Sequence, residues 1–489
     1  MTTHWHKQSA HEIVEAVAKG AVSASAVTEA YLQRIDAVDA KIGAYTQGWD
    51  DTARAMAQQV DEKIARGEKP GILAGVPISL KESICTITGK TTCSSKMLEN
   101  FRSPYDATVV SRLQAADAVF LGKVNMDEFA MGSSTENSAH QKTYNPWNPD
   151  YIPGGSSGGS AAAVSAGQCA VSIGSDTSGS VRLPASLCGC VGMKPSYGRI
   201  SRYGLVALAS SMDTIGPLTR SVKDAALVLN ALCGADSKDA MTAPDAVPDF
   251  TQALTEDIHG LRIGIPKEYF GEELEPQVRE RVETAISLLE KNGASLVELS
   301  LPTTEYATAV YLVLCAAEAS ACLARLDGIR YGFRHPDAQT TEDVYVLSKS
   351  AGFGPEVRRR ILLGTCLLSK GFYDTYFVKA QKVRTLIKRD FEAAFSQCDL
   401  IAGPVSPVAG FEFGLKAGNP VQMQLSDLYT VSANLAALPA ISVPCGVTDS
   451  GLPVGLQLMA RPFNEAAILN AAYFYEQNRG FSMEYPTLV

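Results

Sequence analysis

A Gly/Ser-rich tract between Pro153 and Ser180 constrains the fold of this chain more than any other segment. It begins with PGGSSGGS, continues through an alanine-rich run and ends with GSDTSGS at residues 174–180. Glycine permits backbone conformations that other residues avoid, so each end of the tract can form a tight turn that carries hydroxyl groups. The tract therefore predicts two serine-bearing turns, and no cluster of His, Cys or carboxylate residues elsewhere in the sequence looks as much like a reaction centre.

The segments around the tract alternate between helical and strand patterns. Residues 160–167 are mostly small and predict a tightly packed helix, and residues 170–173 predict a buried strand that ends just before the second turn. Upstream, residues 71–80 predict a turn with a short strand, residues 109–116 a helix, and residues 118–122 a buried strand. This alternation favours an α/β layer fold.

The two ends of the chain extend this pattern. Apolar residues recur at helical spacing from Ser9 to Ile42. This spacing predicts an amphipathic helical segment near the N-terminus, with Ser23 and Ser25 as candidate helix caps. Near the other end, residues 440–443 and 454–458 are strand-like and flank turn residues. They predict a hairpin-like return to the sheet.

Residues 307–395 are expected to be largely helical. Their first part, Ala307 to Leu326, is the longest apolar stretch, but Glu318 and Arg325 interrupt it, so a buried helix is favoured over a membrane span. A basic segment near the end of this region is expected to form a solvated helix face. Its basic residues are Lys379, Lys382, Arg384, Lys388 and Arg389.

Composition and residue spacing argue against several classes of function. The 489 residues carry a net charge of -9, whereas a broad nucleic-acid footprint needs clustered Lys and Arg. The 11 cysteines are scattered without a CxxC pair, and residues 1–19 lack the apolar core of a secretory signal, which favours reduced thiols in the cytoplasm. The 6 histidines form no HExxH motif, so no catalytic metal is expected.

Two motif matches fail on their context. Residues 89–91, Gly-Lys-Thr, imitate the end of a P-loop, but Ile84 stands where that loop requires glycine. Residues 154–158 fit the GxSxG nucleophile elbow, but the segment before them is rich in Pro and Asn and does not resemble a buried strand. Only His259 and His335 lie downstream to supply a base for that elbow.

What remains is a serine hydrolase that works without histidine. A serine hydroxyl needs a base to take its proton, and a lysine can do this only when its amine is neutral, which burial away from solvent promotes. Lys81 ends the strand-like run GVPISLK at residues 75–81, where a solvated lysine has little reason to sit. Lys81 is therefore the candidate base, with a surface lysine at a strand end as the alternative.

The candidate base and the two turns together resemble the amidase signature family, whose catalytic unit is Ser, cis-Ser and Lys. Lys81 is followed 75 residues later by Ser156 in the first turn, and Ser180 comes a further 24 residues on. Other segments resemble the members of that family that hydrolyse glutamine for tRNA-dependent amidotransferases. These segments are residues 125–138, 201–206 and 438–444.

The resemblance covers nearly the whole chain and carries expectations about its fold. It implies a single amidase domain over residues 1–489 with a three-layer α/β/α fold, in which a central mixed, twisted sheet is flanked by helices. Within this domain we expect a helical entry at 1–60, the catalytic core at 71–220, a mostly helical substrate-pocket region at 307–396 and a return to the sheet at 420–475.

By the same resemblance, Ser180 is the nucleophile, and Ser156 passes its proton to neutral Lys81. The peptide bond before Ser156 is expected to be cis, and Ser157 to give a supporting hydrogen bond at most. The oxyanion hole is expected to be formed by backbone N–H groups. These belong to Thr177, Ser178, Gly179 and Ser180.

The substrate pocket implied by the resemblance fits glutamine. Arg360 is expected to hold the α-carboxylate, because a guanidinium matches a carboxylate in geometry and charge. Asp427 is expected to hold the α-ammonium, and Tyr311 and Met131 to line the pocket. The neighbouring Arg358 and Arg359 are expected to lie on a solvated helix face.

The implied function is the glutaminase part of a tRNA-dependent amidotransferase, a carbon–nitrogen ligase in which glutamine donates the amide nitrogen. The chain is expected to release ammonia from glutamine for the conversion of Glu-tRNA(Gln), or Asp-tRNA(Asn), to the correctly amidated form. A second, B subunit would bind the tRNA and use ATP and Mg, and a small C subunit would complete a heterotrimer. No cofactor in this chain and no membrane contact are expected.

Four positions depart from the family pattern. Ser178 stands where the family usually has glycine, and would be strained there if the position required a positive φ. Glu82 and Ser83 replace the usual Asp-Asn pair, and Leu183 replaces a glutamine. Two alternatives therefore stay open, namely a free-standing amidase for small amides and an inactivated amidase-like scaffold.

Overall fold

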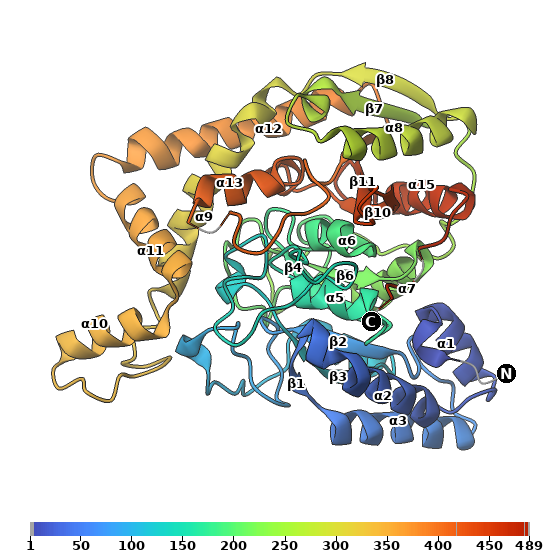
Figure 1. Ribbon diagram of the computed structural model, residues 1–489, viewed down its shortest axis with the longest axis horizontal. Coiled ribbons are helices and arrows are strands. Elements are labelled where there is room, and N and C mark those ends of the chain that lie inside the picture. Colours follow the sequence, from blue (N-terminus) through green and yellow to red (C-terminus); the bar gives the residue numbers. More distant parts are fainter. Residues whose placement is uncertain (1–3, 417, 484, 488–489) are drawn as a thin grey trace.

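A single mixed sheet of 11 strands runs through the protein, and helices flank it (Figure 1). The computed structural model describes residues 4–416, 418–483 and 485–487. The order of strands across the sheet is β1-β3-β2-β4-β6-β5-β10-β11-β9-β7-β8. This arrangement agrees with the α/β layer fold predicted from the alternating helix and strand patterns.

Parallel pairing occurs in two parts of the sheet. The strand β2 runs parallel to both β3 and β4, and β7 runs parallel to both β8 and β9, whereas the remaining pairs are antiparallel. The central strands are buried along their whole length, which is why they read as apolar runs in the sequence. The strands are β1 Tyr45–Gly48, β2 Pro77–Lys81, β3 Val119–Val124, β4 Val171–Asp176, β5 Val191–Lys194, β6 Thr214–Thr219, β7 Arg262–Pro266, β8 Ser295–Leu299, β9 Leu400–Pro404, β10 Ala440–Val447 and β11 Pro453–Ala460.

The helices begin and end close to the expected positions. The α-helices are α1 Ala10–Ala18, α2 Ala24–Ile42, α3 Asp50–Ala65, α4 Thr108–Ala115, α5 Gly158–Ser165, α6 Arg182–Cys188, α7 Val222–Leu232, α8 Pro276–Lys291, α9 Ala307–Leu323, α10 Thr341–Gly352, α11 Pro355–Leu367, α12 Lys379–Ala394, α13 Pro420–Gln424, α14 Val431–Leu435 and α15 Glu465–Asn478. Of the two candidate caps, Ser23 caps α2, whereas Ser25 lies inside the helix and bonds Asp61. A cap must accept a hydrogen bond from the first turn, and only Ser23 does so.

The helix α5 is built from small residues because it packs closely against the rest of the core. Its eight residues are all buried. A Cβ atom added to Gly159 would lie 2.4 Å from the carbonyl oxygen of Asn125, so only glycine fits there. The helix therefore lies directly against the chain that follows β3, and the Gly/Ser turn at its start is held in the middle of the protein.

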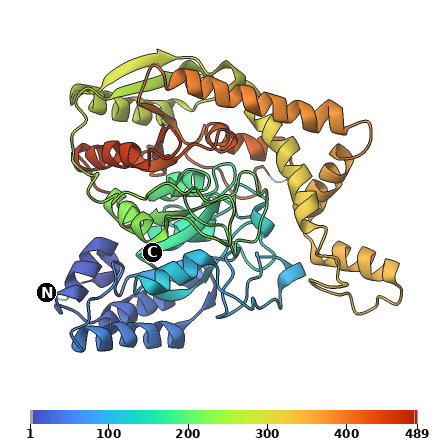
Figure 2. The same cartoon turned by 180° about the vertical axis from the view of Figure 1, so that it is seen from behind.

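The region 307–395 is largely helical, as predicted, and α10 and α11 extend away from the sheet (Figures 1 and 2). The helical stretch Pro302–Leu323 is long and apolar enough to cross a membrane by length and composition, and half of it is buried within the protein. The basic segment is not a uniformly solvated face. The guanidinium of Arg384 turns inward and donates to the carbonyl oxygens of Ser211 and Leu435, so it ties α12 to the core.

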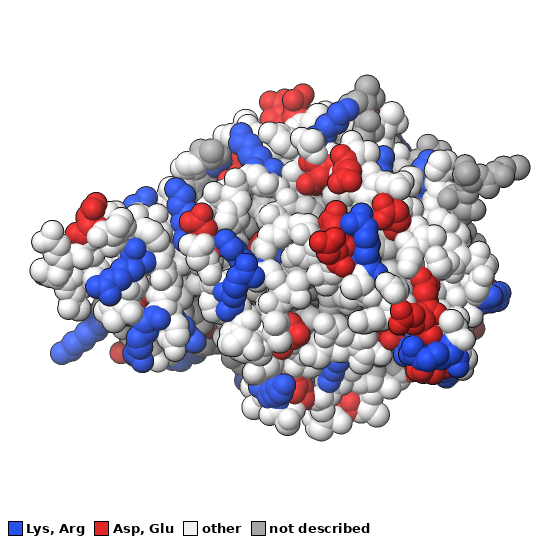
Figure 3. Space-filling model, turned by 90° about the horizontal axis from the view of Figure 1, so that it is seen from below, with Lys and Arg blue, Asp and Glu red and all other residues white. Residues whose placement is uncertain are grey.

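Acidic and basic side chains are interspersed on the face of the molecule drawn in Figure 3. No continuous basic surface appears on that face.

Candidate active site

Lys81 and the first turn of the tract meet in the protein interior. Lys81 is the last residue of β2, and its Nζ atom lies 2.8 Å from Ser156 Oγ and 2.7 Å from Ser157 Oγ. A third hydroxyl, that of Ser175 on β4, lies 3.0 Å from the same Nζ. The Gly155–Ser156 peptide bond is cis, as the family resemblance implies. Lys81 is thus a buried amine surrounded by hydroxyl groups and not a surface lysine.

The surroundings of Lys81 favour its neutral form. Burial lowers the pKa of Lys81 to about 7, although Asp127, Asp176 and Asp213 act in the opposite direction. None of these carboxylates forms an ion pair with Lys81 in the described structure, so nothing neutralises its charge at contact distance. A lysine with a pKa near 7 is partly neutral at physiological pH and can accept a proton.

Ser157 is held by the sheet as well as by Lys81. Its hydroxyl donates to the carbonyl oxygen of Ser175 at 3.1 Å, so its proton is already engaged. Ser156 makes no such contact with the backbone among the described residues. The Ser156 hydroxyl therefore has Lys81 as its partner, whereas the Ser157 hydroxyl is bonded to both Lys81 and the backbone.

Ser180 lies in the second turn, after β4, and the backbone joins the two turns. The amide of Ser157 donates to the carbonyl oxygen of Ser180 at 3.2 Å. Ser180 is only 3 % exposed. Among the described residues no hydrogen bond joins its hydroxyl to that of Ser156, so the step from nucleophile to relay remains a prediction.

The second turn offers unused backbone donors. No hydrogen bond from the amides of residues 177–180 to another described residue is found. Four consecutive free N–H groups beside a serine hydroxyl can stabilise an oxyanion. The positive φ in this turn is at Gly179, at 146°, and not at Ser178. The strain that a positive φ would have caused at Ser178 is therefore absent.

Ser178 has a specific partner instead. Its hydroxyl donates to Asp427 Oδ2 at 2.9 Å, and its carbonyl oxygen accepts from Thr430 Oγ1 at 2.6 Å. Ser133 and Gln424 also donate to Asp427 Oδ2, at 2.8 and 3.1 Å. The other oxygen of this carboxylate, Oδ1, is buried and has no partner among the described residues.

Asp427 therefore presents one satisfied and one free oxygen. Burial raises the pKa of Asp427 to about 7, while hydrogen bonds from Ser133 and Ser178 act in the opposite direction. A Cβ atom added to Gly179 would lie 3.3 Å from Oδ1, so this oxygen faces the turn that carries Ser180. A buried carboxylate oxygen without a partner suits a cationic ligand group, because that group would satisfy it.

Arg360 lies on α11 and is also buried. Its Nε donates to Glu356 Oε1 at 2.7 Å, and its Nη1 lies 3.6 Å from Cys315 Sγ on α9. Burial would lower the pKa of Arg360, but Tyr311, Cys315 and Glu356 outweigh it and raise the pKa. Arg360 thus stays charged, and its Nη2 makes no hydrogen bond to another described residue.

Two further residues that were expected to line the substrate pocket are buried. Tyr311 is buried on α9, one helical turn before Cys315, whose Sγ lies 3.6 Å from Arg360 Nη1. Met131 is fully buried and starts the loop that carries Ser133 to Asp427. Of the two neighbouring arginines, Arg358 is exposed, as expected, whereas Arg359 pairs with Glu356.

Several supporting residues could not be assigned a role from the sequence. Ser175 and Ser133 are single hydroxyls in a serine-rich chain, and only the fold places them on Lys81 and Asp427. Asp127 accepts from the amides of Thr135 and Asn137, and it packs so closely on Gly155 that a Cβ atom there would lie 2.2 Å from its Oδ2. Asp127 thereby shapes the turn of Ser156 from outside.

Two of the remaining departures from the family pattern, Glu82 and Leu183, have side chains that make their contacts elsewhere. The buried Glu82 carboxylate accepts from Thr46, Gln47 and Thr92. Leu183 belongs to a small apolar cluster with Ile152, Leu187 and Phe411. Neither side chain makes a hydrogen bond to Lys81, Ser156 or Ser180 in the described structure.

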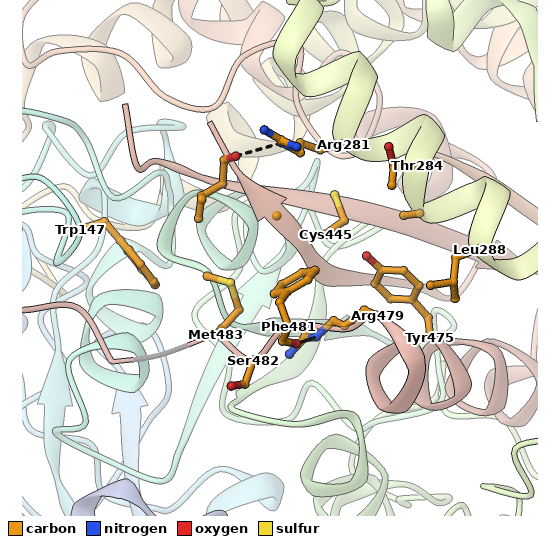
Figure 4. Close-up of a pocket in the computed structure, with 13 residues that line it drawn as sticks. Trp147, Arg281, Thr284, Leu288, Cys445, Tyr475, Arg479, Phe481, Ser482 and Met483 are labelled. Carbon is orange, nitrogen blue, oxygen red and sulfur yellow. Dashed lines mark hydrogen bonds between the residues drawn. The ribbon is translucent and has the colours of Figure 1, made fainter. Parts of the chain in front are cut away.

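A cavity of about 550 Å³ lies elsewhere, between α8, β10 and α15 (Figure 4). Arg281, Cys445 and Arg479 are among its lining residues, and Lys81, Ser156 and Ser180 are not. Both arginines donate to backbone carbonyl oxygens. In the described residues no group of three or more His, Cys, Asp or Glu side chains is arranged to hold a metal ion.

Comparison with known proteins gives matches over the length of the chain. The amidase family model matches residues 26–469. The A subunit of glutamyl-tRNA(Gln) amidotransferase from Moorella thermoacetica is 54% identical over 480 residues, which cover 98% of each chain. The crystal structure of the same subunit from Thermotoga maritima is 39% identical, with a TM-score of 0.83 and coverage of 99% of this chain and 98% of that chain. The peptide amidase from Stenotrophomonas maltophilia is 30% identical, with a TM-score of 0.83 and coverage of 99% of both chains.

Proposed function

This chain belongs to the amidase family, and from that premise we propose that it is the glutamine-hydrolysing subunit of a tRNA-dependent amidotransferase. The amidotransferase subunits from Moorella thermoacetica and Thermotoga maritima match it at 54% and 39% identity over nearly the full length. The observation that carries the catalytic part of the proposal is the buried Lys81 amine, 2.8 Å from Ser156 Oγ, beside a turn of four free amides. This arrangement supplies a base, a proton relay and an oxyanion site without histidine.

In the proposed reaction Ser180 Oγ attacks the side-chain amide carbon of glutamine. Its proton passes to Ser156, whose own proton passes to neutral Lys81, and the negative charge on the amide oxygen is stabilised by amides of residues 177–180. When the C–N bond breaks, the proton returns from Lys81 through Ser156 to the leaving nitrogen, which departs as ammonia. The product left on the enzyme is a glutamyl ester of Ser180.

The second half of the reaction uses the same groups with water in place of the serine. Water attacks the ester carbon and gives its proton through Ser156 to Lys81. The C–O bond to Ser180 then breaks, and Ser180 Oγ regains a proton by the reverse route. Glutamate leaves, and Lys81 is neutral again, so one glutamine and one water yield one glutamate and one ammonia.

Two charged side chains support glutamine as the substrate. The free Oδ1 of Asp427 faces the nucleophile turn and suits an α-ammonium group, and the charged guanidinium of Arg360 suits an α-carboxylate. Tyr311 and Met131 line the space near these groups in the proposal. A small amide without those charged groups would leave the Asp427 oxygen unsatisfied.

The ammonia would be used by partner subunits. We propose that a B subunit binds the misacylated tRNA and activates it with ATP and Mg, and that a C subunit completes a heterotrimer. The interspersed charge on the face drawn in Figure 3, together with the net charge of -9, supports leaving the nucleic acid to a partner. All 11 cysteines are free thiols, which supports a reducing compartment such as the cytoplasm.

The proposal is tested by measuring glutamate release from glutamine by the chain assembled with its partner subunits, with Ser180→Ala as the inactive control. Turnover of glutamine that Ser180→Ala abolishes supports it. Hydrolysis of short or peptide amides by the chain alone, without glutamine turnover in the complex, would favour a free-standing amidase like the relative from Stenotrophomonas maltophilia. No turnover of any amide would favour a scaffold role.

A further inference from the structure

We propose that the Ser178 side chain is a positioning residue that sets the preference for a substrate carrying an α-ammonium group, by orienting Asp427 towards it. This inference rests on the proposed glutamine hydrolysis and concerns the side chain of Ser178, whereas the oxyanion role assigned to that residue uses its backbone amide. The hydroxyl lies two residues before the nucleophile and 2.9 Å from Asp427 Oδ2.

The two carboxylate oxygens of Asp427 have different surroundings. Oδ2 accepts hydrogen bonds from Ser133, Ser178 and Gln424, which come from three different parts of the chain. Three donors fill that oxygen and prevent the carboxylate from rotating. Oδ1, which is buried and unpartnered among the described residues, is therefore held facing the turn of Gly179.

Ser178 connects this carboxylate to the reacting serine. Thr430 Oγ1 donates to the carbonyl oxygens of Ser178 and Asp427, at 2.6 and 3.1 Å, so the backbones of the two residues are joined as well as their side chains. Of the three donors to Oδ2, only Ser178 lies on the nucleophile turn. Its side chain is therefore the direct link between Asp427 and the turn that carries Ser180.

Ser178 also affects the charge of Asp427. A hydroxyl that donates to a carboxylate stabilises the ionised form, so loss of Ser178 raises the pKa of Asp427 above its value of about 7. The charged groups that face Asp427 from other elements are Asp176 on β4, Arg182 on α6 and Lys416, which lies before α13. Truncation of Ser178 changes none of these groups, so the shift of the pKa would report the lost hydrogen bond.

The test compares glutamine with glutaramate, which is glutamine without its α-amino group. In the assembled complex, Ser178→Ala is expected to lower the ratio of kcat/KM for glutamine to kcat/KM for glutaramate roughly tenfold, as expected for the loss of a hydrogen bond to a charged group, because any effect on the shared oxyanion site cancels in this ratio. Ser133→Ala removes another donor to the same oxygen and is expected to act in the same direction. Ser165→Ala, which removes a buried hydroxyl without a partner among the described residues, is the matched control with no change in the ratio.

The pH dependence separates this role from a structural one. The ratio of kcat/KM for glutamine to that for glutaramate cancels the titration of Lys81, because both substrates need that base. In the wild type this ratio is expected to fall as the pH drops through about 7, where Asp427 takes up a proton, and in Ser178→Ala to fall at higher pH.

The inference would be overturned if Ser178→Ala and Ser133→Ala both kept the wild-type ratio of kcat/KM for glutamine to kcat/KM for glutaramate and the wild-type midpoint of its pH dependence. That outcome would leave the proposed glutamine hydrolysis in place. A wild type that hydrolyses neither substrate would instead contradict the proposed function. If Ser178→Ala fails to fold, the comparison is made with Ser178→Thr and Ser133→Ala. Ser178→Thr keeps the hydroxyl and is expected to retain the wild-type ratio, whereas Ser133→Ala is expected to lower it.

Discussion

Lys81 Nζ and Ser156 Oγ lie 2.8 Å apart, although 75 residues separate them in the chain. The contact arises because β2 and β4 are parallel neighbours. Their carboxyl ends lie side by side, so Lys81 at the end of β2 meets the tract around β4 there. The base, the relay and the nucleophile turn are therefore brought together by one pair of strands.

The first prediction concerns the charge of Lys81. Because its pKa is about 7 and only the neutral amine accepts a proton, kcat/KM for glutamine is expected to rise with pH through about 7, where ionisation of Asp427 acts in the same direction, and then to level off. Lys81→Arg is expected to be inactive at every pH, since a guanidinium is not deprotonated. Initial rates of glutamate release between about pH 5 and 9, which brackets that pKa, check this. If Lys81→Arg still hydrolysed glutamine, with a kcat/KM that rose with pH as in the wild type, Lys81 would not be the base.

The second prediction distinguishes the two adjacent serines that contact Lys81. Ser156→Ala removes the proposed relay and is expected to lower kcat by about 10²- to 10⁴-fold. Ser157→Ala removes a supporting hydrogen bond to the Ser175 carbonyl, and its effect on kcat is expected to be much smaller. Steady-state kinetics on both variants measure the difference. Equal losses would mean that the two hydroxyls act as one unit.

The third prediction concerns recognition of the α-carboxylate. Arg360→Lys is expected to raise KM for glutamine about tenfold or more. The ammonium of lysine is a point charge, whereas the planar guanidinium offers several N–H donors to a carboxylate. Arg358→Ala, on the exposed side of α11, serves as the control and is expected to leave KM unchanged. An unchanged KM in Arg360→Lys would remove this residue from the proposed pocket.

The fourth prediction concerns the backbone of the nucleophile turn. A Cβ atom at Gly179 would lie 2.2 Å from Thr430 Oγ1, and φ there is 146°. Gly179→Ala is therefore expected to displace Thr430, abolish most glutamine hydrolysis and lower the melting temperature. Gly451 also has a positive φ, of 79°, but has open space around its Cβ, so Gly451→Ala is expected to keep full activity. Thermal melts and turnover of both variants provide the comparison.

The fifth prediction concerns the buried ion pair beneath the second turn. Arg182 Nη2 lies 3.0 Å from Asp176 Oδ1, and both side chains are fully buried. Arg182→Met is expected to destabilise the fold by about 3–5 kcal/mol, because Asp176 is left as an uncompensated charge. Urea denaturation measures this loss. Disruption of the exposed Arg66–Glu68 pair by Arg66→Ala is expected to cause no measurable change.

The same pair gives a pH dependence of stability. Burial would raise the pKa of Asp176, but Arg182 outweighs it and lowers the pKa to about 2 from an ordinary 3.8. A lowered pKa in the folded state contributes stability above the unfolded value and loses it as the pH falls from about 4 to about 2. The contribution is about 2 kcal/mol. Urea titrations in that pH window, on the wild type and on Arg182→Met, are expected to show the loss only in the wild type.

The sequence was most informative where local chemistry and chain spacing agreed. The glycines around Ser156 and Ser180 predicted two turns, and the apolar run before Lys81 predicted a buried strand that ends in a lysine. Both patterns depend on backbone freedom and on burial, which are properties of neighbouring residues in the chain. The same is true of the hairpin at β10 and β11 and of the helix cap at Ser23.

The departures from expectation have a different origin. Ser178 looked like a source of strain, but the positive φ belongs to Gly179, and the Ser178 hydroxyl bonds a carboxylate 249 residues away in the chain. Arg384 looked solvated because its neighbours on α12 are basic, but the helix packs so that its guanidinium reaches Ser211. Contacts of this kind depend on which elements meet, and no local pattern specifies them.

The sequence by itself thus determined where the two turns and the candidate base lie along the chain, because glycine content and apolar periodicity act over a few residues. Only the tertiary structure decided that the Gly/Ser tract holds Ser156 against a desolvated Lys81, that Ser175 and Ser133 join the site, and that Asp427 has one free oxygen facing the second turn. The physical reason is that desolvation, which lowers the pKa of Lys81 and raises that of Asp427, depends on the residues packed around a group in space.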